Sequence, residues 1–224
     1  MPRKGATGMG RIRILAVRAR TLLAVCGLVA VITLMFSTAF WRQIYPIFYY
    51  PIIQTEATQM NVNPLLIAAV VRVESHFRED DISHAGAIGL MQLMPDTAIW
   101  IARKIGQPLP GVSATSAGIS GTSGGNVIAA LTPAQSKAII LALSDPQINV
   151  RLGSWYVAYL LRMFHGDLPE AVAAYNAGPN RVQGWLKQGV WSGDEVTGDD
   201  IPVRETRHFL ARVMYTYGMF ERHY

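Results

Sequence analysis

The sequence predicts an all-α protein in which one transmembrane helix precedes a single helical domain. Residues 21–40 contain no charged residue, and twenty residues are about the length that a helix needs to cross the hydrocarbon core of a bilayer. The rest of the 224-residue chain shows helix start and stop signals almost throughout. It contains no convincing alternation of the kind that predicts paired strands, and no internal repeat. The length suffices for one domain with a sizeable core.

The basic residues are concentrated at the amino terminus. The chain has 20 basic and 15 acidic residues, and six of the basic ones lie within residues 1–20, where no acidic residue occurs. The remainder therefore carries 14 basic and 15 acidic residues, a net charge of −1. Binding to nucleic acid needs clustered basic side chains, so this distribution excludes nucleic acid as the expected partner.

We interpret the apolar run as a membrane anchor over residues 21–41, behind a basic cytoplasmic tail over residues 1–20. Basic residues favour the cytoplasmic side, and aromatic residues gather at the membrane interface. Residues 42–224 are therefore expected on the outer side of a bacterial cytoplasmic membrane, with the amino terminus inside. The aromatic residues that follow the run are Trp41, Tyr45, Tyr49 and Tyr50.

A cleaved signal peptide is the alternative interpretation of the same run. The small residues Ser37, Thr38 and Ala39 would form its cleavage site, but the apolar run is longer than a usual signal-peptide core. Cys26, the single cysteine of the chain, lies inside the run. Residues 42–224 therefore contain neither a disulfide nor a cysteine nucleophile, which fits a bacterial envelope protein.

The first predicted helix after the anchor lies in "VNPLLIAAVVRVESHF", residues 62–77. Asn63 is a suitable N-cap and Pro64 a suitable first helical residue, and the helix is expected to run to about Ser75. A second helix, within residues 94–105, is expected to open at Asp96 or Thr97.

Three further helices are predicted along the rest of the chain. Ser144 or Asp145 is expected to cap a long amphipathic helix over residues 144–164. A short helix in "LPEAVAAYNAG" is expected to stop at Gly178 and Pro179, and "IPVRETRHFLARVMYTYGMF" predicts a closing helix. Residues 107–136 contain no charge and many Gly, Ser and Thr residues, which predicts a flexible insertion, either a lip of a substrate cleft or a solvated loop.

Glu74 falls in the last turn of the helix that Pro64 opens. The negative end of the helix dipole disfavours an ionised carboxylate, and apolar neighbours would add desolvation, so we expect a raised pKa. A carboxyl that stays protonated near neutral pH is suited to donate a proton to a glycosidic oxygen. By position alone, however, a glutamate at a helix end is more often a solvated surface residue.

Three motifs change that assessment. The segments "ESHF…S…GAIGLMQLMPDTA", "AYNAGPNRV" and "IPVRETRHFLARV" resemble, in order and spacing, the soluble-type lytic transglycosylases. The resemblance covers roughly residues 54–217, and its nearest form is a short membrane-anchored enzyme. It implies a goose-lysozyme-like helical catalytic domain that acts on the glycan strands of peptidoglycan.

The resemblance also implies roles for particular residues. The catalytic acid falls on Glu74, the serine that orients its carboxyl on Ser83, and a nearby supporting tyrosine on Tyr175. Four further residues are expected to bind saccharide or to line the cleft: Gln92, Met94, Asn176 and Glu205. The five histidines have no metal-ligand spacing, so no metal and no cofactor are expected.

The mechanism that the resemblance implies uses one acid. Glu74 protonates the leaving oxygen, the 2-acetamido group of the substrate stabilises the cation, and Glu74 then deprotonates the 6-hydroxyl group. The product is a 1,6-anhydro-N-acetylmuramic acid end, and no water is consumed. Two alternatives remain: a hydrolytic muramidase on the same fold, and a non-catalytic glycan-binding scaffold of the envelope. Partners in envelope machinery are not readable from the sequence.

Overall fold

The computed structural model describes residues 22–34, 37–107, 109–110 and 132–224. The chain divides into two units. Unit 1 comprises Met1–Pro46 and His223–Tyr224, and unit 2 comprises Ile47–Arg222.

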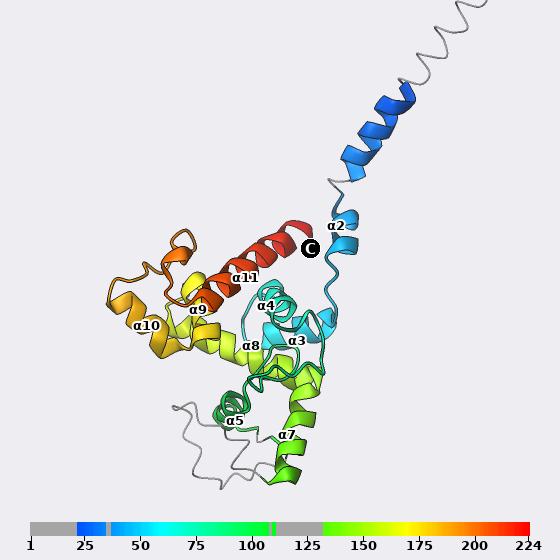
Figure 1. Cartoon of the computed structure of the whole chain (residues 1–224). Helices are drawn as coiled ribbons and strands as arrows, with labels where there is room; N and C mark the ends of the chain where they lie inside the picture. Colours follow the sequence, from blue (N-terminus) through cyan, green and yellow to red (C-terminus); the bar gives the residue numbers. More distant parts are fainter. Residues whose placement is uncertain (1–21, 35–36, 108, 111–131) are drawn as a thin grey trace, which may run out of the picture. The chain divides into compact units, whose positions relative to one another are not determined.

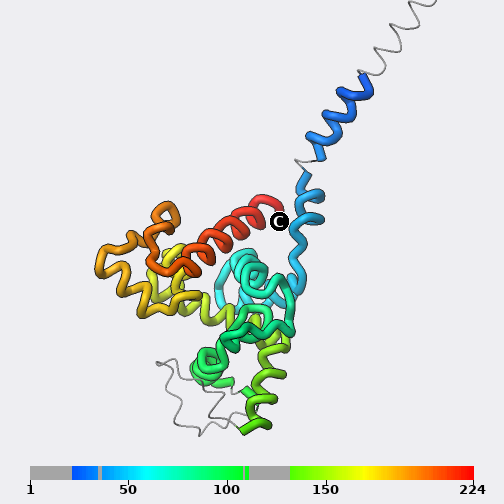
Figure 2. Tube along the Cα trace, in the orientation of Figure 1, coloured from blue at the N-terminus to red at the C-terminus, as the bar shows by residue number. Residues whose placement is uncertain are grey.

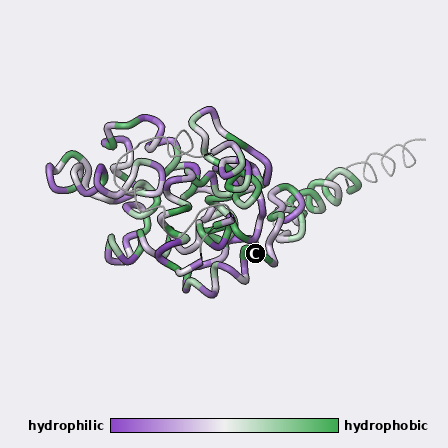
Figure 3. Tube along the Cα trace, turned by 90° about the horizontal axis from the view of Figure 1, so that it is seen from below, coloured by the Kyte–Doolittle hydropathy of each residue, from purple (hydrophilic) through white to green (hydrophobic). Residues whose placement is uncertain are grey.

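The described part of the amino-terminal segment in unit 1 is helical and apolar. The segment Leu22–Leu34 is exposed along its length, and Figure 3 colours most of it at the hydrophobic end of the scale. Helix α2 spans Thr38–Ile44. Among the described residues no single helix is both long and apolar enough to span a membrane, whereas these two segments pass that test together as a bent pair. The anchor stays a prediction, and its basic tail lies outside the described residues.

Unit 2 is built from helices, as predicted (Figure 1). Within the described ranges the only extended pairings are isolated bridges in the loop after α4. The elements are α3 (Tyr50–Gln59), α4 (Pro64–Ser75), α5 (Pro95–Lys104), α7 (Pro133–Ser144), α8 (Pro146–Met163), α9 (Leu168–Ala177), α10 (Pro179–Lys187), the 3-10 turn η1 (Gly198–Asp200) and α11 (Arg204–His223).

Proline and capping side chains set the starts of these helices. A proline lacks the backbone donor that the first turn leaves unused, so it is favoured at the first helical position. The first residue is a proline in α4, α5, α7, α8 and α10. Asn63 caps α4 by accepting from the Leu65 amide at 2.9 Å, and Asp145 caps α8 by accepting from the Ile148 amide at 2.9 Å. Both predicted caps are confirmed.

Two boundaries differ from the prediction. Helix α5 begins at Pro95, before the expected Asp96 or Thr97, because proline is favoured at the first helical position, and the N-cap residue Met94 forms no capping side-chain bond. The predicted insertion, residues 107–136, overlaps the first turn of α7. Thr132 and Gln135 form a capping box there, and the box starts α7 before the first charged residue of the helix, Lys137. Residues 108 and 111–131 lie outside the described residues.

Helix α8 is the central element of unit 2 and contacts α3, α4, α5, α7 and α9 (Figure 2). A buried ion pair joins α8 to α3. The guanidinium of Arg151 donates to both carboxylate oxygens of Glu56, at 2.9 and 3.1 Å, and the Glu56 side chain is 1 % exposed. Because α8 contacts five other helices, its side chains can form hydrogen bonds with the loops that surround the candidate site.

Candidate active site

The end of α4 presents Glu74 at the edge of the core. His76 adopts a left-handed backbone conformation (φ 54°, ψ 35°), which ends the helix at Ser75. Val73 and Ser75 on either side are buried, whereas Glu74 is half-buried. The helix therefore ends with one carboxyl group that is partly withdrawn from solvent, at the position predicted from the sequence.

Burial raises the pKa of the Glu74 carboxyl to about 8. The Arg212 guanidinium opposes this rise and the Glu205 carboxylate adds to it, so both side chains of α11 lie within electrostatic reach of Glu74. Within the described residues no hydrogen bond to the Glu74 carboxyl is formed that would stabilise its ionised state. The predicted rise is confirmed, and a pKa raised to about 8 favours the protonated carboxyl at neutral pH.

Residues 82–93 form a tight loop next to the end of α4. Ile88 pairs with both Ile82 and Leu93 through single antiparallel bridges. The Ser75 hydroxyl donates to the Leu90 carbonyl at 2.8 Å, which ties the loop to the last residue of α4. The loop therefore has a defined position relative to Glu74.

Asn149 of α8 holds this loop from within the core. Its side-chain oxygen accepts from the Met91 amide at 2.7 Å, and its Nδ2 donates to the carbonyls of Ile88 at 2.9 Å and Leu143 at 2.8 Å. Gly89 has a φ of 80°, and a Cβ there would overlap the Leu143 carbonyl and the Asn149 amide. Asn149 was not predicted as a site residue, because nothing in its local sequence distinguishes it from other helix residues.

Ser83 is held by its own loop. Its hydroxyl accepts from the Ala87 amide at 3.0 Å, and its backbone amide donates to the Ala87 carbonyl at 2.9 Å. Among the described residues no hydrogen bond links Ser83 to Glu74. The predicted orienting contact is thus not formed in this structure, and a catalytic role for Ser83 stays a prediction.

Tyr175 links the loop to α9. Its hydroxyl donates to the Met91 carbonyl at 2.7 Å, and its ring stacks on Phe209 with centroids 6.2 Å apart. Burial, and after it the Glu74 carboxylate, raise the pKa of the Tyr175 phenol well above its ordinary value. The structure therefore brings Tyr175 near Glu74 as a neutral phenol, with its proton directed at the loop.

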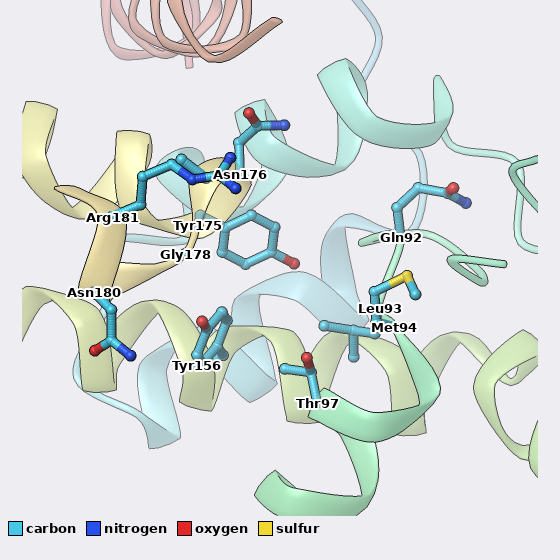
Figure 4. A pocket seen from close by; sticks show the side chains of 11 residues that line it. Gln92, Leu93, Met94, Thr97, Tyr156, Tyr175, Asn176, Gly178, Asn180 and Arg181 are labelled. Atoms are coloured by element: carbon cyan, nitrogen blue, oxygen red, sulfur yellow. The ribbon is translucent and has the colours of Figure 1, made fainter. Parts of the chain in front are cut away.

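A cleft of about 590 Å³ opens beside these residues. Figure 4 shows Gln92, Leu93 and Met94 across the cleft from the end of α9 and the start of α10. Glu74 does not line this cleft. The lining residues are Gln92, Leu93, Met94, Thr97, Tyr156, Tyr175, Asn176, Ala177, Gly178, Asn180 and Arg181.

Asn176 and Glu205 connect the cleft to the surroundings of Glu74. The Asn176 side-chain oxygen accepts from the Thr206 hydroxyl at 2.7 Å, and its Nδ2 lies 3.5 Å from a Glu205 carboxylate oxygen. Glu205 itself is exposed in the first turn of α11. The structure thus brings together these two predicted binding residues, although they come from different motifs.

Gln92 and Met94 occupy the other wall of the cleft. The Gln92 amide donates to the carbonyls of Asp81 and Gly89, both at 3.0 Å, and its backbone has a positive φ of 45°. Met94 is 41 % exposed. Gln92 therefore shapes the loop with its amide nitrogen, while the thioether of Met94 offers an apolar surface to a ligand.

Besides Asn149, five residues of the site were not identified from the sequence. Tyr156 of α8 and Thr97 of α5 line the cleft, and Arg212 acts on the pKa of Glu74. Asn180 and Arg181 also line the cleft, and they belong to the "AYNAGPNRV" motif, so closer attention to that motif would have found them. In the described part of the chain no group of three or more His, Cys, Asp or Glu side chains is placed to hold a metal ion.

Comparison with known proteins gives a consistent result. The sequence profile of the family "Transglycosylase SLT domain" matches residues 51–119 and 130–196. The soluble lytic murein transglycosylase of Escherichia coli K12 is 28 % identical over 181 residues, which cover 80 % of this chain and 24 % of that protein. The chain thus spans about a quarter of the length of the curated relatives it matches first.

Solved structures of larger proteins share the fold. The 70 kDa soluble lytic transglycosylase of E. coli aligns with a TM-score of 0.63 at 27 % identity, over 81 % of this chain and 25 % of that one. An inactive mutant of the lytic transglycosylase Slt from Pseudomonas aeruginosa aligns with a TM-score of 0.61 at 31 % identity, over 80 % of this chain and 25 % of that one.

Proposed function

The chain belongs to the transglycosylase SLT family, and on that premise we propose that it cleaves the glycan strands of peptidoglycan as a lytic transglycosylase. The observation that carries the proposal is the Glu74 carboxyl, whose pKa is raised to about 8, together with its neighbour Tyr175, which lines an open cleft. A general acid must hold its proton at the working pH until the leaving group accepts it. Relatives named lytic murein transglycosylase support the same activity.

In the proposed reaction Glu74 gives its proton to the glycosidic oxygen between N-acetylmuramic acid and N-acetylglucosamine. The bond from C1 to that oxygen breaks, and the substrate's own 2-acetamido group stabilises the cation. The Glu74 carboxylate then takes the proton of the 6-hydroxyl group as its oxygen attacks C1. The acid is regenerated, a 1,6-anhydro end is formed, and no water is consumed.

The surroundings of Glu74 are suited to both of its proposed protonation states, the acid before cleavage and the carboxylate after it. Burial favours the protonated state before cleavage, whereas the Arg212 guanidinium favours the carboxylate that exists between the two proton transfers. We propose that four residues contact the saccharide: Gln92, Met94, Asn176 and Glu205. Tyr175 positions the loop through the Met91 carbonyl.

Digestion of purified sacculi tests the proposal directly. Mass spectrometry of the released fragments should find 1,6-anhydro ends with the wild-type protein and at least a thousandfold fewer with Glu74→Gln, because a carboxamide cannot donate the proton. Glu195→Gln is the matched control, since Glu195 is exposed and belongs to none of the three motifs. Reducing ends in place of anhydro ends would identify a hydrolase, and undiminished yield from Glu74→Gln would remove Glu74 from the mechanism.

We further propose that residues 21–41 anchor the protein in the bacterial cytoplasmic membrane, with the catalytic domain on the outer side. Support comes from the exposed apolar segment Leu22–Leu34. A protein named membrane-bound lytic murein transglycosylase C, from Actinobacillus pleuropneumoniae, is 42 % identical over 50 residues, 22 % of this chain and 14 % of that protein. Retention of the protein in membranes washed with alkaline carbonate checks the anchor, and release into the wash would contradict it.

A further inference from the structure

Arg181 is the one charged residue among the eleven described residues that line the cleft. The other ten are neutral, either apolar or able to form hydrogen bonds through amide and hydroxyl groups. Figure 4 shows the Arg181 side chain extending from α10 along the wall that also carries Asn176. A neutral saccharide needs hydrogen-bonding groups of this kind, but it has no group that requires a guanidinium.

The charge of Arg181 has no counterion in the described part of the protein. Arg181 is exposed and takes part in no described ion pair. The carboxylate of Glu205 is instead placed next to the amide of Asn176, at 3.5 Å. Arg181 is therefore available to an anionic group of a ligand in the cleft.

Arg181 is not needed to hold α10 in place. The buried residues of α10 are Val182 and Trp185, and Pro179 starts the helix. An exposed arginine that adds little to packing, yet lines a cleft, is better explained by ligand binding than by stability. A guanidinium presents several donors in one plane and is matched in geometry to a carboxylate.

Carboxylates in peptidoglycan lie on the peptide stem, since the sugars carry only hydroxyl and acetamido groups and the lactyl carbonyl is joined to the peptide as an amide. Resting on the proposed function, we propose that Arg181 binds a carboxylate of the peptide stem and makes the enzyme prefer strands whose stems carry free carboxylates. The proposal assigns Arg181 a role in substrate selection, separate from the proton transfers at Glu74.

Binding measurements on the inactive Glu74→Gln protein test this proposal without turnover. Uncrosslinked glycan strands with intact stems are compared with the same strands after carbodiimide coupling of their carboxylates to methylamine, which removes the charge and keeps the peptide. We expect the dissociation constant to be about tenfold lower for the unmodified strands, as is typical for a charge-assisted hydrogen bond. The preference should weaken at high salt.

Two additional substitutions make the result specific to Arg181. Arg181→Gln should abolish the preference, whereas Lys187→Gln should retain it, because Lys187 has the same charge and lies in the same helix but does not line the cleft. Equal affinity for both strand preparations, or a preference that survives Arg181→Gln, would overturn the proposal.

A third strand preparation identifies the source of the carboxylate. Strands from which an amidase has removed the peptide expose a lactyl carboxylate, and we expect them to bind as weakly as the methylamide strands. Binding as tight as that of intact strands would assign Arg181 to the lactyl group and overturn the assignment to the stem. Turnover by the wild-type protein is measured separately, so that loss of the proposed activity and loss of carboxylate selection are distinguishable.

Discussion

Glu74 is the residue whose chemistry depends most on its surroundings. A glutamate in solution titrates near pH 4.5, and here burial raises the pKa to about 8 while two charges on α11 act in opposite directions. Arg212 favours the ionised form and Glu205 the protonated form. Substitution of either residue should therefore shift the pKa of Glu74, in opposite directions.

The raised pKa of Glu74 predicts how the rate of the proposed reaction depends on pH. Because the acid must be protonated, kcat/KM should fall as the pH rises through about 8. Arg212→Gln should move this decline to higher pH, since it removes a charge that lowers the pKa, and Glu205→Gln should move it to lower pH. Rates of anhydro-end formation from soluble strands across the pH range check the three midpoints. Shifts of both variants in the same direction would contradict this arrangement of charges.

The same pKa predicts a dependence of stability on pH. The folded-state pKa of Glu74 lies above the unfolded value of 4.5, so its contribution is fully present below about pH 4.5 and is lost as the pH rises to about 8. Glu74→Gln lacks this loss. Relative to the wild type, its free energy of unfolding should therefore rise by roughly 1–3 kcal/mol between these pH values, allowing for the solvent at a half-buried group.

Urea unfolding curves at pH 4.5 and 8 measure this difference, with Glu195→Gln as the control for an exposed glutamate. If the difference in the free energy of unfolding between Glu74→Gln and the wild type were the same at both pH values, ionisation of Glu74 would not destabilise the fold.

At the scale of elements, the site depends on the attachment of the loop 82–93 to two helices. Ser75 binds it to α4 through the Leu90 carbonyl, and Asn149 binds it to α8 through two hydrogen bonds, with the Met91 amide and the Ile88 carbonyl. Gly89 and Gly153 allow the close approach, since a Cβ on Gly153 would overlap the Met91 side chain. The loop is thus part of the core, although it has almost no regular secondary structure.

Removal of the Asn149 amide tests this attachment. Asn149→Ala removes one hydrogen bond from each of three buried backbone groups, of which the Ile88 carbonyl keeps the Leu93 amide as a donor, so we expect the free energy of unfolding to fall by roughly 2–4 kcal/mol. Denaturant titration followed by circular dichroism measures the change. Gln183→Ala, at an exposed position of α10, should change it by less than about 0.5 kcal/mol. A loss for Asn149→Ala as small as that of the control would show that the loop does not depend on α8.

At the scale of unit 2, α8 packs against five other helices. The buried ion pair of Glu56 and Arg151 connects it to α3. Glu56 is almost completely buried, whereas Arg151 retains partial exposure (1 % and 28 % for the side chains). Gln147 also donates to Glu56, at 3.3 Å. A carboxylate at this depth is tolerated because three donor groups surround it.

Loss of one partner should be costly. Arg151→Met leaves the Glu56 carboxylate buried without its cation, and we expect a loss of about 3–5 kcal/mol in the free energy of unfolding. The control is Arg78→Met at the surface pair with Asp81, where Arg78 is 64 % exposed and the loss should stay below about 1 kcal/mol. The double variant Glu56→Leu with Arg151→Met should recover most of the stability. Equal effects at the buried and the surface pair would contradict the importance of burial.

Much of the fold was predictable because helix starts are local signals. Asn63 with Pro64, and Asp145 with Pro146, start their helices as predicted. Helix α10 was missed because Pro179, interpreted as a stop after Gly178, is also the first residue of the next helix. Helix α3, which opens at Tyr50, was not predicted either, since the aromatic residues before it were interpreted only as a membrane interface.

The site was predictable where one motif holds the residue. Glu74 and Tyr175 were placed near each other by the resemblance, and the structure brings them together. Arg212 and Asn149 were missed because each acts on a partner more than fifty positions away along the chain, through a contact that no local pattern indicates.

The sequence by itself determined where α4 and α8 start, where α4 ends, and that a glutamate stands at that end. These features follow from proline, capping side chains and turns, whose effects reach only a few residues along the chain. The tertiary structure decided the protonation state of Glu74. It also decided that the cleft is lined by neutral residues and a single arginine. Desolvation and Coulomb interactions depend on distance in space, and here they involve helices that lie about a hundred residues or more after Glu74 in the sequence.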